Sequence, residues 1–207
     1  MKRILIGMAV LALALSAPLS VAAGRGESVD PLLMQPPLNA TFGPWECWRT
    51  GTGITCEGQR TLTAVGVESL FVCGGRPVYT NEVDVRTQRR YGDENGLALK
   101  TVQHVDNRGI LGFEADLSGP NLTGMGIYEE TFSYSVPGDL SSRTDRYTGM
   151  DVRITGPGVG LVMHDVGVKM FDIDDNVLFA HGPHPLVDED FESAFAGVCP
   201  ALDAIGA

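Results

Sequence analysis

Apolar and polar residues alternate along much of the chain from residue 45 onward, in short runs. In the clearest run, Ile110 to Leu117, every second side chain is apolar and the side chains between are glycine or carboxylate. A period of two places successive side chains on opposite faces, which is typical of a half-buried β-strand. We predict strands over runs of this kind at 83–86, 97–105, 110–117, 127–136, 152–154 and 161–166.

Turn-forming residues separate these runs. Glycine, asparagine and aspartate cluster at 92–96, 106–109 and 174–176, and the glycine-rich segment 156–160 indicates a turn or bulge. Such residues tolerate the left-handed backbone that tight hairpins require. Short strands joined by short turns predict an antiparallel all-β domain of eight to ten strands. We expect a β-barrel, with a β-sandwich as the alternative, because a barrel leaves no exposed strand edges.

Only the C-terminal end has a helical pattern. Asp188 is a candidate N-cap, and Phe191, Phe195 and Val198 follow the spacing of one helix face. We therefore predict a short helix that packs on the β domain and is stopped by Pro200.

The N-terminus has the features of a secretory signal. Lys2 and Arg3 precede an apolar run from Ile4 to Leu15, and small residues follow at 21–23. The run is shorter than the roughly 18 to 20 residues of a membrane span, which favours cleavage after residue 23 over retention as an anchor. The proline-rich segment 24–44 then predicts a flexible lead-in, and 45–207 a single β domain. We expect a secreted, extracellular protein without stable membrane insertion once the signal is removed.

The charge balance is acidic, with a formal net charge of −11 that becomes more negative when the leader is removed. Nucleic-acid binding normally requires the opposite bias, so nucleic acid is not an expected partner.

The chain contains four cysteines, Cys47, Cys56, Cys73 and Cys199. An oxidising compartment favours disulfides, although four cysteines allow three pairings. A hairpin centred on residues 50–53 favours Cys47 with Cys56, which leaves Cys73 with Cys199. Their spacings match no common zinc pattern.

Three histidines, His164, His181 and His184, are the candidate metal ligands, because neutral imidazole binds zinc and similar ions. The signal is weak, because Gly182 and Pro183 place His181 and His184 in a loop rather than on one helix face. Asp172 and Asp174 resemble the start of a calcium loop, but the later ligands of that motif are missing. We predict no metal and no cofactor.

Carboxylates on the polar strand faces, Glu114, Asp116, Glu129 and Asp151, are candidates for acid–base chemistry if those faces line a barrel interior. In a half-exposed sheet the same residues would face water. The chain has no phosphate-binding loop and no serine-nucleophile motif. We therefore lean against an enzyme.

The C-terminal third contains the segments Ile154-Thr155-Gly156-Pro157-Gly158-Val159-Gly160, Asp165-Val166-Gly167 and Val177 to His184, followed by Cys199. This series resembles small, largely uncharacterised secreted bacterial proteins with β-barrel-like folds. The resemblance implies export and a barrel-like body, and it implies no active-site residue.

These observations favour a secreted, disulfide-stabilised module that binds a small apolar ligand or a protein partner. The alternative is a barrel-type cyclase or isomerase that uses Glu114, Glu129 or a histidine as acid or base.

Overall fold

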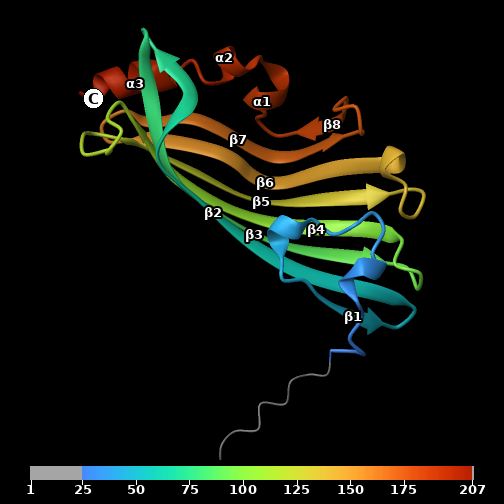
Figure 1. Cartoon of the computed structure of the whole chain (residues 1–207). Helices are drawn as coiled ribbons and strands as arrows, with labels where there is room; N and C mark the ends of the chain where they lie inside the picture. Colours follow the sequence, from blue (N-terminus) through green and yellow to red (C-terminus); the bar gives the residue numbers. More distant parts are fainter. Residues whose placement is uncertain (1–24, 207) are drawn as a thin grey trace, which may run out of the picture.

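The computed structural model describes residues 25–206, so the predicted leader lies outside the described residues. The described chain forms one eight-stranded antiparallel sheet in which each strand pairs with the next along the sequence (Figure 1). The strands are β1 Glu46–Thr50, β2 Gly53–Cys73, β3 Arg76–Gly92, β4 Ala98–Gly112, β5 Leu122–Tyr134, β6 Arg143–Gly156, β7 Gly160–Phe171 and β8 Val177–His181. The predicted antiparallel all-β class is confirmed.

The sheet is open, with β1 and β8 at its two edges. Neither the expected barrel closure nor a second sheet is present in residues 25–206. Closure requires two edge strands to pair along their backbones, and β1 and β8 have only five residues each. The sheet is instead strongly curved (Figure 1).

Two local predictions in the middle of the chain were wrong. The run 110–117 is not one strand, because β4 ends at Gly112 and Leu117 adopts a positive φ of 51° in the connection to β5. Asn121 stabilises this connection by donating to the carbonyls of Leu117 and Gly119. The predicted turn at 106–109 lies inside β4, where Asn107 donates to Glu82 on the neighbouring strand. The turns at 92–96, 156–160 and 174–176 are confirmed.

The C-terminal segment contains three short helices rather than one, namely α1 Pro185–Asp188, α2 Phe191–Ala194 and α3 Val198–Ala204. Asp190 caps α2 by accepting from the Ser193 backbone N–H. The predicted stop at Pro200 was wrong because Pro200 lies in the first turn of α3, where a missing N–H costs no helical hydrogen bond. Within residues 25–206 no helix has the length and apolar character needed to span a membrane.

The segment before β1 lies against the sheet. It contains the single-turn 3-10 helices η1 Pro31–Leu33 and η2 Ala40–Phe42, and a third, η3 Leu140–Ser142, precedes β6. Arg90 of β3 donates to the carbonyls of Pro36 and Pro37, which ties the segment to the face that carries Arg90.

We call that face, which also carries Val78 of β3, the inner face. It bears two separate apolar cores. At one end, Val198, Ala201 and Leu202 of α3 pack on Val78 and Leu122. At the other end, Val29 and Met34 of the N-terminal segment pack on Ile54 and the first disulfide. The middle of the inner face lies between these cores.

One disulfide lies at each of the two ends of the inner face. Cys47 bonds Cys56 across the β1–β2 hairpin, and Cys73 at the end of β2 bonds Cys199 in α3. These are the pairs that the sequence favoured. Their sequence separations are 9 and 126 residues, so the second bridge restricts the unfolded chain far more than the first.

The long bridge should therefore contribute more stability. We expect the Cys73→Ser/Cys199→Ser variant to lose about 5 kcal/mol of unfolding free energy, and Cys47→Ser/Cys56→Ser about 3 kcal/mol. Guanidinium unfolding followed by circular dichroism measures both values. An equal loss in the two variants would contradict the loop-length argument.

Candidate ligand site on the inner face

A row of polar side chains crosses the inner face between the two apolar cores. Cross-strand pairing places one polar residue from each of five neighbouring strands in the same register. From β3 to β7 the row consists of Gln88, Gln103, Glu130, Tyr147 and Lys169. We call these five residues the polar row. Sheet faces that pack in a core are normally apolar, so a buried polar row requires an internal network of partners.

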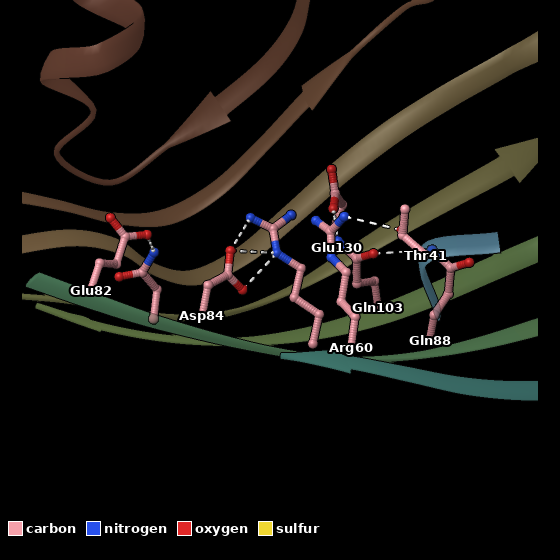
Figure 2. A network of polar contacts seen from close by, with 9 residues as sticks. Thr41, Arg60, Glu82, Asp84, Gln88, Gln103 and Glu130 are labelled. Atoms are coloured by element: carbon pink, nitrogen blue, oxygen red, sulfur yellow. Dashed lines mark hydrogen bonds and ion pairs between the residues drawn. The ribbon is translucent and has the colours of Figure 1, made fainter. Parts of the chain in front are cut away.

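Hydrogen bonds along the row have a defined direction. Gln88 Nε2 donates to Gln103 Oε1 at 3.0 Å, and Gln103 Nε2 donates to Glu130 Oε2 at 2.6 Å. Figure 2 shows these side chains rising from neighbouring strands on the same side of the sheet. The Glu130 carboxylate accepts, which orients both amides and leaves Gln88 Oε1 buried without a partner among the described residues.

Burial raises the pKa of Glu130 and Tyr147 in this row and of Tyr128 beside it. It raises the pKa of Glu130 above its ordinary value of 4.5, although Tyr147 and Arg86 oppose the shift. Burial and the hydrogen bond to Glu130 raise the pKa of the Tyr147 phenol. Burial raises the pKa of Tyr128 to about 12, with the Asp151 carboxylate as the next cause. Both tyrosines are therefore neutral hydrogen-bond donors at ordinary pH.

Lys169 ends the row in a buried charge cluster. Its ammonium contacts the carboxylates of Asp151 and Asp165, the latter at 3.3 Å. Asp165 is fully buried and also accepts from the backbone N–H of Leu186. Its remaining partner is His184, whose Nδ1 lies 3.0 Å away. Asp165 thus links β7 to the start of the C-terminal helical segment.

His184 is a structural residue in this arrangement. Its Nδ1 faces a carboxylate and its Nε2 faces the carbonyl of His181 at 3.2 Å. Both ring nitrogens therefore already have a polar partner within the protein. Neither ring nitrogen is left to bind a metal ion.

A cavity of about 230 Å³ lies on the inner face beside this cluster. Its polar wall contains Glu82, Asn107, Tyr128 and Asp151, and its apolar wall contains Leu111, Val152 and Ile154. Gly109, Gly124 and Gly126 are also among its lining residues. A pocket with apolar walls and a few convergent polar groups is the usual form of a small-molecule site.

The three glycines differ in what the fold requires of them. A Cβ at Gly109 would lie 2.8 Å from the Asn81 carbonyl oxygen, and one at Gly126 would collide with the Asp151 carbonyl. At Gly124 the nearest atom would be the Gly109 carbonyl oxygen at 3.9 Å, an ordinary contact, and the φ there is not positive. The fold therefore needs glycine at 109 and 126, whereas at 124, which also lines the cavity, the local backbone leaves room for a side chain.

A larger hollow of about 540 Å³ lies near the N-terminal end, around Glu57, Arg89 and His104. The Arg89 side chain is half exposed, and its ion pair with Glu57 lies at the surface, where such pairs contribute little. We consider the smaller cavity the better candidate site because a hydrogen bond from Asn107 to Glu82 and an ion pair between Asp151 and Lys169 fix its polar wall.

The structure separates most of the residues singled out from the sequence. His164 pairs in register with Arg153, one residue from Asp165, so it lies on the face opposite His184. Residues 25–206 contain no cluster of three or more His, Cys, Asp or Glu side chains suited to a metal ion.

The four candidate carboxylates are also separated. Glu114 and Asp116 lie in the β4–β5 connection. Glu129 pairs in register with His104 on the outer face, so only Asp151 reaches the cavity.

Sequence reasoning missed Glu82, Tyr128 and Lys169. Lys169 stands in the apolar run Val166 to Phe171, where an isolated charge is a sign of a buried partner. The pair Gly124 and Gly126, two residues apart in a strand, was a second usable sign, because strand glycines often mark close approach of another group.

Comparisons with protein-family models, curated proteins and solved structures found no match for this chain.

Glu130→Gln tests the buried carboxyl. Because the folded-state pKa lies above the unfolded value of 4.5, the folded protein binds more protons between the two values, and stability falls as pH rises through that window. The variant removes this contribution, so its unfolding free energy should fall less steeply above pH 4.5. Urea unfolding from pH 4 to 7 measures the slopes. The exposed turn variant Glu94→Gln should keep the wild-type slope, and a Glu130→Gln slope parallel to it would contradict the prediction.

Asp165→Asn tests the link to the C-terminal segment. The amide places an N–H₂ group among donors, and it leaves Lys169 with Asp151 as its remaining carboxylate partner and His184 without its carboxylate acceptor; breaking such a buried pair costs about 3–5 kcal/mol. Hydrogen exchange at residues 184–188 should accelerate in the same variant. The exposed Asp188→Asn serves as control and should change stability by less than about 0.5 kcal/mol. Unchanged exchange in Asp165→Asn would show that this contact does not hold the segment.

Proposed function

We propose that this chain is an exported binding protein that holds a small ligand in the inner-face cavity. The single observation that carries the proposal is Gly124, a glycine that the local backbone does not need and whose missing side chain keeps the cavity open. Strand interiors normally gain from a side chain, because glycine costs conformational entropy and packs nothing. A glycine at position 124, where the strand would accept a side chain, therefore supports a binding role for the cavity.

The surroundings of the cavity support a preorganised site. Asp151 is held by Lys169, and Asn107 is held by Glu82 at 2.5 Å, so two polar wall residues have fixed orientations. Preorganised walls reduce the entropy lost on binding. The two disulfides fit a protein that works outside the cell.

The ligand that we propose differs from the small apolar ligand or protein partner that the sequence favoured. An apolar ligand would suit only the wall of Leu111, Val152 and Ile154, and it would leave Glu82 and Tyr128 without water. We therefore favour a small molecule with one polar end and one apolar end. The enzyme alternative gains no support from Glu114 and Glu129, which share no site.

Gly124→Val tests this proposal. Valine suits a strand, and its Cβ would meet only an ordinary contact with the Gly109 carbonyl oxygen at 3.9 Å, so the variant should fold with unchanged or slightly higher stability while its side chain fills the cavity. The probe is a fragment set of short-chain amines, alcohols and carboxylates, added to the disulfide-bonded protein and followed by amide chemical shifts at Gly109, Gly126 and Tyr128. Binding that shifts these amides in wild type should be lost in Gly124→Val.

Gly119→Val is the matched control, because a Cβ at Gly119 would also meet only one ordinary contact at 3.9 Å and its φ is not positive, but it lies in the β4–β5 connection. It should bind as wild type does. Equal fragment binding in Gly124→Val and wild type would overturn the proposed site.

A further inference from the structure

The inner-face cavity contains one carboxylate that no cation neutralises. Asp84 is paired with Arg86 through contacts of 2.7 to 2.9 Å, and Asp151 is paired with Lys169. Glu82 has no arginine, lysine or histidine within ion-pair distance in residues 25–206. Figure 2 shows Glu82 beside Asp84 in the same line of side chains. Among the described residues, the amide of Asn107 is the hydrogen-bond donor to Glu82.

A half-buried carboxylate without a cation is electrostatically unfavourable, because burial removes water and no opposite charge replaces it. The amide of Asn107 satisfies one oxygen of Glu82. The second oxygen retains acceptor capacity and belongs to a residue that lines the cavity. A cationic donor placed there would make a charge-assisted hydrogen bond.

The rest of the cavity indicates what kind of cation fits. Tyr128 supplies an aromatic ring beside the carboxylates, and aromatic rings attract ammonium groups. Leu111, Val152 and Ile154 form a wall with no donor or acceptor side chain, which suits hydrocarbon rather than a hydrated metal ion. The volume of about 230 Å³ limits the ligand to a few heavy atoms beyond the charged group.

From this combination we infer that the ligand of the cavity is a small organic ammonium ion, with its charged nitrogen at Glu82 and a short hydrocarbon part against Leu111 and Ile154. This inference rests on the proposed binding function and names the ligand class for the same cavity.

The test compares three probes of similar shape on the disulfide-bonded protein: n-butylammonium, n-butanol and butyrate. The amide shifts of Gly126 and Tyr128 report binding. Butylammonium should bind most tightly, butanol weakly and butyrate not at all. Added salt should weaken butylammonium binding, because the contact is ionic.

Glu82→Gln should weaken butylammonium binding at least about tenfold, since a charge-assisted hydrogen bond becomes a neutral one. Glutamine keeps an oxygen that can accept from Asn107, so the local fold is preserved. Glu94→Gln, an exposed glutamate in the β3–β4 turn, is the matched control and should bind as wild type does. Thermal unfolding of each variant checks that it is folded, and the probe comparison in wild type is independent of any variant.

The outcomes separate the two proposals. If butanol binds as tightly as butylammonium, or if Glu82→Gln has no effect while Gly124→Val abolishes binding, the ammonium inference is wrong and the binding proposal stands. If no probe shows binding that Gly124→Val removes, the proposed function itself is wrong.

Discussion

The structure depends on the attachment of both chain ends to one face of a single open sheet. An isolated sheet cannot bury its own apolar side chains, so its apolar face must be covered by another layer of the structure. Here the cover comes from two short segments at opposite ends of the inner face, the N-terminal segment over Ile54 and α3 over Val78 and Leu122. The disulfide between Cys73 and Cys199 fixes the second cover in place.

Because the two covers do not meet, the middle of the inner face has no apolar partner. A polar row fills it, and burial there is tolerated because Gln88, Gln103 and Glu130 bond to one another and Lys169 bonds two carboxylates. The cavity lies next to this row. The arrangement of the covers therefore creates the candidate site, since a continuous second layer would have required apolar side chains at these positions.

The charge pattern around the cavity follows from the same geometry. Asp84 pairs with Arg86 on the same strand, and Asp151 and Asp165 share the ammonium of Lys169. Glu82 has only an amide partner. A carboxylate that contacts its ligand directly is more selective than a general acidic surface, because salt screens distant charges more strongly than a contact at short range.

Much of the fold followed from the sequence by itself. The period of two and the turn residues determined the antiparallel all-β class, because both act within a few residues along the chain. The hairpin at residues 50–53 brought Cys47 next to Cys56 for the same reason.

Tertiary structure decided the rest. The pattern shows which residues share a face but not whether that face is covered, so the open sheet, rather than a barrel, could not be foreseen. The meeting of Glu82, Tyr128 and Asp151 depends on the register of β3, β5 and β6, and the link from Asp165 to His184 depends on where the C-terminal segment returns to the sheet. Long-range pairings of this kind leave no periodic trace in a single sequence.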